Sequence, residues 1–111
     1  MREPTYYILV ALSGAESMHG YAIAQRAKEL SDERVRITAG TLYGALDRLE
    51  KAGSIEVDRV EKVDGRQRRY YRIAKQGRSE LADEIVRMKS ALAAHATVTT
   101  SAASAIAGGL A

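Results

Sequence analysis

The chain has 111 residues, a formal net charge of +3 and no cysteine. This length predicts one domain with a modest core, and the lack of cysteine excludes disulfides and thiolate zinc sites. The apolar run 6–12 is too short to span a membrane, and Glu3 and Pro4 before it do not fit a secretory leader. We therefore expect a soluble cytoplasmic protein with no membrane association.

Two helices are expected in the N-terminal part of the chain. Pro4 suits a first helical turn, and an almost wholly apolar helix follows it until residues 13–14. Because such a helix has no polar face, we expect it to be buried on more than one side, in part by a second subunit. Ser17 is a suitable cap for a second helix over residues 18–30, and a polar connection follows over residues 31–37.

The clearest element in the sequence is a third helix. Thr38 is a suitable N-cap and Gly53 a suitable C-terminal stop, and the two residues frame about four turns. The apolar residues between them recur at helical spacing: Leu42, Ala45, Leu46, Leu49 and Ala52.

The opposite face of this third helix carries unusually small side chains near its N-terminal end. It carries Gly40, Gly44, Asp47 and Lys51, with Tyr43 and Arg48 on its flanks. Glycine in a helix interior costs about 1 kcal/mol relative to alanine. Two outward glycines therefore indicate a helix that presses against a partner, and the alternative is a core helix with a poor surface.

After the third helix the apolar period changes from 3.6 to 2. Residues 55–58 and 70–73 alternate between apolar and polar side chains, and Asp64-Gly65 between them is a strong turn signal. The segment 59–78 carries eight basic and two acidic residues, a net charge of +6, so the remaining residues sum to −3. We predict a two-stranded hairpin with a basic tip, a charge distribution suited to a polyanionic partner.

The helical period returns from Lys75. The apolar residues then step by 4, 3 and 4 positions, a narrow seam typical of a helix that pairs with a like helix: Leu81, Ile85, Met88 and Leu92. The same register continues through His95, Thr99, Ala102 and Ile106, which favours a helix that ends before Gly108-Gly109. The alternative is a disordered tail, because the last sixteen residues are uncharged and rich in Ala, Ser and Thr.

Three helices followed by a hairpin with a basic tip form the element order of a winged helix-turn-helix, whose second paired helix enters the major groove of DNA. Three motifs strengthen this interpretation: the His-Gly-Tyr block at 18–23, the Gly-Thr-Leu-Tyr block at 40–50 and the Arg-Tyr-Tyr strand at 64–71. In order and spacing the chain resembles the PadR family of winged-helix transcriptional regulators from about Pro4 to Leu92.

The resemblance implies a mostly α fold with a small β-hairpin. It divides the chain into a winged helix-turn-helix over residues 1–74, a long C-terminal dimerisation helix over 75–107 and a tail over 108–111. At this length the chain is similar to the short subfamily, in which the last helix packs on the partner's first helix. Two residues depart from the family pattern: Ala39 replaces a common proline, and Ala74 replaces a threonine cap that is worth about 0.5–2 kcal/mol.

The expected DNA-binding residues come from three segments. They are His19, Gly20 and Tyr21 at the start of the second helix, then Thr38, Gly40, Thr41, Tyr43, Gly44, Asp47, Arg48 and Lys51 on the third helix, and Lys62, Gly65, Arg66, Arg68 and Arg69 on the predicted hairpin, which is the wing of the motif.

Several of these residues have a second interpretation. Tyr43 could be a flanking core residue, and Tyr21 could pack beneath a helix cap. Asp47 could orient a neighbouring arginine, accept from a cytosine N4 or be a plain surface charge. Either Arg68 or Arg69 could brace the hairpin instead of contacting phosphate.

The sequence does not indicate an enzyme. Its two histidines, His19 and His95, belong to distant elements, and no cofactor or metal motif accompanies them. We expect a homodimeric repressor that binds an inverted repeat in double-stranded DNA. The alternative is a winged helix used for protein–protein contact, which would not need the basic segment. Whether a small-molecule effector releases the protein from DNA stays open. The chain has no Trp or Phe on which a ligand could stack, and its tyrosines could substitute only weakly.

Overall fold

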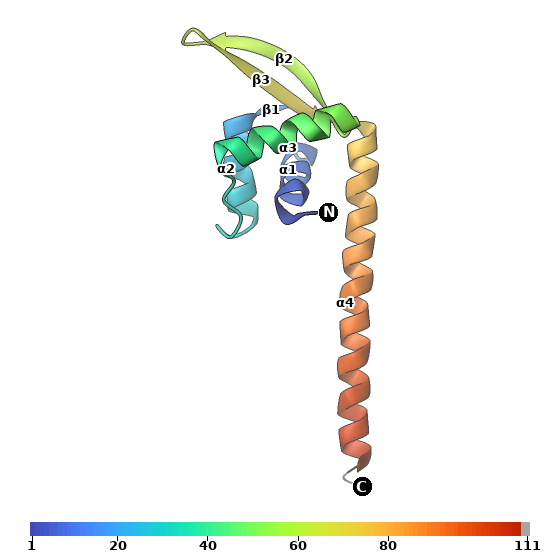
Figure 1. Cartoon of the computed structure of the whole chain (residues 1–111). Coiled ribbons are helices and arrows are strands. Elements are labelled where there is room, and N and C mark those ends of the chain that lie inside the picture. Colours follow the sequence, from blue (N-terminus) through green and yellow to red (C-terminus); the bar gives the residue numbers. More distant parts are fainter. Residues whose placement is uncertain (110–111) are drawn as a thin grey trace. The chain divides into compact units, whose positions relative to one another are not determined.

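The structure is a computed structural model that describes residues 1–109, with side chains through residue 102 (Figure 1). Its elements follow the order α1 (Glu3–Ser13), β1 (Met18–His19), α2 (Gly20–Leu30), α3 (Ala39–Ala52), β2 (Ile55–Val63), β3 (Arg66–Ile73) and α4 (Lys75–Gly109). The fold is mostly α with a small antiparallel sheet, as predicted. The chain divides into two compact units, Met1–Leu81 and a second unit that begins at Ala82.

The core of the first unit is built by α1, α2, α3 and the start of β2. Its largest fully buried apolar side chains are Ile8, Leu9, Leu12, Ile23, Leu46 and Ile55. The first helix has no polar face, yet Tyr6, Tyr7 and Val10 remain half-buried within the chain itself. The predicted cover of this helix by a second subunit therefore stays a prediction.

The third helix has the caps that the sequence predicted. The Thr38 hydroxyl accepts from the Thr41 N–H at 3.5 Å, and Gly53 ends the helix in the left-handed conformation, with φ of 83°. Leu42, Ala45, Leu46 and Leu49 are buried, as the apolar spacing predicted. The prediction for Ala52 was wrong, because this residue lies on the last turn, past the packed part of the helix, and is exposed.

The second helix begins two residues later than predicted, and the sheet has a third strand. Met18 and His19 are extended because they pair with Tyr71 and Tyr70 of β3, which gives the strand order β1-β3-β2. The cap of α2 is consequently His19 rather than Ser17: the Nδ1 atom of His19 accepts from the Ala22 N–H at 3.3 Å.

The predicted hairpin is present, with its turn at Asp64-Gly65. Both turn residues have positive φ, 51° and 76°, as a tight two-residue hairpin turn requires. The ladder is irregular at Asp58, because Val57 faces Tyr71 while Arg59 already faces Tyr70. Such a bulge increases the local twist of the strand and redirects the rest of the hairpin.

The first turns of α4 pack against the junction of α3 and β2. The Ser54 hydroxyl donates to Glu80 Oε1 at 2.8 Å, and Gln76 Nε2 donates to the Ala52 carbonyl at 2.7 Å. Ala74, which lacks a capping hydroxyl, is buried, and its N–H donates to the Ser54 carbonyl at 2.9 Å. Hydrogen bonds to this junction therefore hold the start of α4.

Gly77 permits this contact, and its replacement is a test of it. A Cβ atom at Gly77 would lie 2.1 Å from the Ser54 carbonyl oxygen, so Gly77→Ala forces the backbone apart. We expect urea unfolding to show a loss of about 1–3 kcal/mol, despite the higher helix propensity of alanine. Gly44→Ala is the control, since its Cβ would meet only Arg48 at 3.6 Å. Equal stability of Gly77→Ala and the unmodified protein would contradict the close approach.

The last helix continues through the uncharged segment to Gly109. The Thr97 and Thr100 hydroxyls donate to the Ala93 and Ala96 carbonyls at 3.0 and 2.9 Å, which satisfies these polar side chains within the helix. The predicted helical continuation is confirmed, but the predicted end before Gly108-Gly109 was wrong, because the helix includes both glycines. The side chain of Ile106 and residues 110–111 of the predicted tail lie outside the described residues.

The exposed part of the predicted dimerisation seam lies beyond the first unit. Leu81 is buried in the first unit, whereas Met88 is 37% and Leu92 is 70% exposed. Val86 and Val98 are also exposed, although neither belongs to the seam register. None of the helices in residues 1–109 is apolar over enough of its length to cross a bilayer.

Candidate nucleic-acid interface

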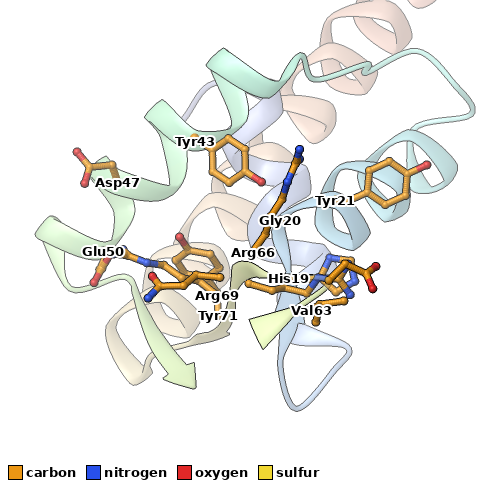
Figure 2. A pocket seen from close by; sticks show the side chains of 13 residues that line it. His19, Gly20, Tyr21, Tyr43, Asp47, Glu50, Val63, Arg66, Arg69 and Tyr71 are labelled. Carbon is orange, nitrogen blue, oxygen red and sulfur yellow. The ribbon is translucent and has the colours of Figure 1, made fainter. Parts of the chain in front are cut away.

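A groove of about 880 Å³ lies between α3, the start of α2 and the hairpin (Figure 2). It brings together eight of the predicted DNA-binding residues: His19, Gly20, Tyr21, Tyr43, Asp47, Arg66, Arg68 and Arg69. The remaining predicted residues lie outside its lining: Thr38, Gly40, Thr41, Gly44, Arg48, Lys51, Lys62 and Gly65. Five further residues complete the groove and were not predicted to contact DNA: Glu50, Val63, Asp64, Gln67 and Tyr71.

Two tyrosines border the groove and are mostly exposed. Tyr43 is 56% and Tyr21 is 68% exposed, so neither is the packed residue that the alternative interpretations proposed. Gly20 makes room for Tyr43, because a Cβ there would lie 3.2 Å from both the ring and the hydroxyl oxygen of Tyr43. The Tyr21 hydroxyl accepts from Gln25 Nε2 at 2.8 Å. The helix-turn-helix thus presents both tyrosines at the surface beside the groove.

The outward face of α3 carries small residues near its N-terminus and charged residues farther along. Gly40 and Thr41 are exposed and Gly44 is half-exposed. Asp47 pairs with Lys51 at 3.0 Å rather than with an arginine, and both side chains are largely exposed. Exposed pairs of this kind contribute at most about 1 kcal/mol, so a phosphate or a base could displace either partner.

The base of the hairpin neutralises part of its own positive charge. Arg59 pairs with Asp58 at 3.0 Å and Glu61 at 2.7 Å, and it also donates to the Ser17 hydroxyl at 3.0 Å. Its guanidinium lies 3.9 Å from the centre of the Tyr70 ring. On the same strand pair, Arg72 bonds Glu56 at 3.0 Å and Asp58 at 3.3 Å.

Four cations at and near the hairpin tip have no such ion pair within the described part of the chain. Among the described side chains, no carboxylate lies within 4 Å of the charged groups of Lys62, Arg66, Arg68 or Arg69. Burial raises the pKa of Tyr71, and the positive charge of Arg69 beside its hydroxyl partly offsets that rise. Arg69 thus contacts the groove wall, whereas Arg66 projects into the groove between Gly20 and Tyr43 (Figure 2).

The comparisons with known proteins identify the family. Residues 8–83 match the model of the Transcriptional regulator PadR-like family. The chain belongs to the PadR-like family. Members of this family are transcriptional regulators and not enzymes, in agreement with the sequence analysis.

Individual relatives agree with this membership. The transcriptional regulator Rv3488 of Mycobacterium tuberculosis is 42% identical over 67 residues, which are 60% of this chain and 59% of that protein. A transcriptional regulator structure from Clostridium thermocellum has 29% identity and a TM-score of 0.67, covering 77% of this chain and 81% of the other. Bacillus subtilis PadR, solved in complex with operator DNA, shares the fold with a TM-score of 0.67 at 24% identity, over 77% of this chain and 48% of that one. These matches confirm the predicted winged-helix fold.

In this PadR-like chain His19 connects the wing to α2. Its Nδ1 atom caps α2, and its ring meets the Tyr70 ring edge-on, with 5.6 Å between the centres. Burial lowers the pKa of His19 below 6.5, and the positive charge of Arg68 lowers it further. Protonation would occupy the capping nitrogen, so the folded state favours the neutral imidazole.

This arrangement predicts a dependence of stability on pH. Because the pKa of His19 is lower in the folded state, the unfolded state binds more protons, and stability falls as the pH drops below 6.5. His19→Asn keeps a capping side chain but cannot titrate, and we expect it to lose less stability between pH 7.5 and 5.5 than the unmodified protein. Urea unfolding at both pH values measures the difference. Parallel losses in the two proteins would show that His19 does not titrate in this range.

Proposed function

We propose that this PadR-like regulator binds DNA sequence-specifically and represses transcription as a homodimer on an inverted-repeat operator. The observation that carries the proposal is the groove between the exposed face of α3 and a hairpin whose cations Arg66, Arg68 and Arg69 line it without an ion pair to any described side chain. Operator DNA in the structure of Bacillus subtilis PadR supports the assignment of this partner. Its place of action is then the cytoplasm, where the DNA is.

The third helix is the element that reads the sequence. The major groove of B-DNA is about 12 Å wide and admits one α-helix. The exposed Gly40 and Thr41 and the half-exposed Gly44 let the backbone of α3 approach the base edges, because they add little side-chain volume. Arg48, Asp47 and Lys51 then follow along the helix, where they can contact bases or flanking phosphates.

The wing and the start of α2 hold the phosphate backbone. Arg66, Arg68 and Arg69 line the groove opposite Tyr43, and phosphates are the natural ligands of such guanidinium groups. The N–H groups at the start of α2 and the hydroxyls of Tyr21 and Tyr43 add neutral donors. These contacts orient the protein on the duplex, whereas α3 supplies the choice of sequence.

Two experiments test the proposal: the selection of DNA fragments by the protein and the salt dependence of its DNA binding. DNA fragments selected from a random pool by the purified protein should converge on one inverted repeat. On that site the logarithm of the binding constant should fall linearly with the logarithm of the salt concentration, by about 0.9 for each phosphate contacted. Fragments without any shared motif would contradict sequence-specific binding.

Removal of the wing cations should flatten the salt dependence on every DNA sequence. For Arg66→Ala, Arg68→Ala and Arg69→Ala combined, we expect the slope to fall by up to about 2.7, because up to three phosphate contacts are lost. The control removes three other cations that do not line the groove: Arg26, Lys75 and Arg78. If the slope of the salt dependence changes equally in both variants, the wing is not part of the DNA interface.

A further inference from the structure

A second, smaller hollow of about 400 Å³ adjoins the groove between α2 and the start of α3. Its floor is apolar, with Ile37 and Leu42, and two cationic residues, Lys28 and Arg36, line it as well. None of these four residues was predicted to contact DNA.

The hollow and the groove share one border. Tyr21 from α2 and Tyr43 from α3, both largely exposed, line both hollows. A partner that fills the groove and passes these two tyrosines enters the second hollow without leaving the protein surface. The two hollows are thus adjoining parts of one surface on the helix-turn-helix.

The two cations of the hollow are available to a partner. Among the described side chains, no carboxylate lies within 4 Å of the Lys28 ammonium group. Arg36 pairs with Glu33 at 3.6 Å, but these side chains are 69% and 68% exposed. Such a long and solvated pair is weak, so a phosphate can replace Glu33 as the partner of Arg36.

We propose that this hollow is a second phosphate-binding part of the DNA interface, in which Lys28 and Arg36 contact backbone phosphates that the wing does not reach. The inference rests on the proposed DNA-binding function. A DNA backbone suits the site because it alternates anionic phosphates, which match the two cations, with apolar deoxyribose faces, which match Ile37 and Leu42. Its continuity with the groove favours the same duplex over a separate ligand.

Lys28→Ala combined with Arg36→Ala tests the inference. On the selected site we expect the salt slope to fall by up to about 1.8, and binding in 50 mM salt to weaken by roughly tenfold to a hundredfold. Both residues are at least partly exposed, so the fold should be kept, and circular dichroism checks this. The control is Lys75→Ala with Arg78→Ala, which removes the same charge from outside both hollows.

Phosphate-ethylation interference locates the contacts on the DNA. Each variant should become insensitive to ethylation at the phosphates it no longer contacts, and the set for the Lys28 and Arg36 variant should differ from the set for the wing variant. Lys28→Arg with Arg36→Lys should restore both the slope and the pattern, because the charges return. An unchanged slope, or a pattern identical to that of the wing variant, would overturn the inference while DNA binding itself stands. Absence of DNA binding by the unmodified protein would overturn the proposed function and this inference together.

Discussion

Replacement of Gly44 by glutamate is expected to abolish operator binding and to leave the fold intact. Gly44 is half-exposed on the outward face of α3, where the helix backbone is proposed to meet the major groove. A glutamate there would bring a bulky anion against DNA. Juxtaposition of like charges in an interface costs several kcal/mol, which corresponds to a loss of at least about 100-fold in affinity.

The fold has room for this side chain. A Cβ at Gly44 would meet only Arg48 Nη1, at 3.6 Å, which is an ordinary contact with a flexible group. Since glycine is a poor helix former, glutamate should raise the stability of α3 by about 0.5 kcal/mol rather than lower it. Loss of binding would therefore not reflect unfolding, and thermal unfolding of the variant verifies this.

Two further substitutions at Gly44 separate size from charge. Gly44→Gln has the volume of glutamate without its charge, and Gly44→Ala adds only a methyl group. We expect electrophoretic mobility shifts to show the highest affinity for Gly44→Ala, a lower affinity for Gly44→Gln and the lowest for Gly44→Glu. Operator binding by Gly44→Glu as tight as that of the unmodified protein would mean that another face of the domain meets DNA.

The sequence was most informative where a structure is decided by a few neighbouring residues. Thr38 and Gly53 set the ends of α3 through their own hydrogen bond and φ angle. Asp64-Gly65 likewise set the hairpin turn, because few residue pairs tolerate two positive φ angles. The helical spacing of the leucines of α3 then predicted its buried face correctly, except at Ala52 on the last turn.

The sequence did not predict features that depend on contacts between segments far apart in the chain. The two residues of β1 are too few to show an alternating pattern, and they are extended only because Tyr70 and Tyr71 pair with them. The charge of the wing was overestimated for a related reason. Arg72 lies in the basic segment 59–78, but Glu56 and Asp58, which precede that segment in the sequence, pair with it across the hairpin.

The candidate site shows the same division. The sequence motifs supplied most residues of the groove, because each motif is local and contributes one wall. The hollow beside it was not predicted, since it combines Lys28 on α2, Arg36 in the connection and Leu42 on α3. Only the crossing of the two helices brings these three positions together.

The association of two chains through α4 is expected to fail when the seam carries like charges. Met88 and Leu92 are exposed apolar residues on a helix of 35 residues, and together with Ile85 they keep the spacing of a helix that pairs with a like helix. A long helix with exposed apolar side chains gains most of its stability from packing against another element. We propose that this element is α4 or α1 of a second copy.

Ile85→Glu together with Leu92→Glu would bury four like charges in each dimer and cost several kcal/mol of association. Sedimentation should then show a monomer for the double variant and a dimer for the unmodified protein. The control, Ser90→Glu with Thr97→Glu, adds the same charge at the same spacing of seven residues to exposed positions outside the seam register, and it should remain dimeric. A dimeric double seam variant would show that the chains associate through another surface.

The same pair of variants connects dimerisation to operator recognition. Two copies of α3 in one dimer can reach two half-sites about 34 Å apart, one turn of B-DNA, whereas a monomer contacts one half-site at a time. The seam variant should therefore bind the inverted repeat as weakly as it binds a single half-site, and the Ser90 and Thr97 variant should still prefer the repeat. Because neither variant changes the groove or the wing, equal affinity of all three proteins for a single half-site would assign the difference to dimerisation alone.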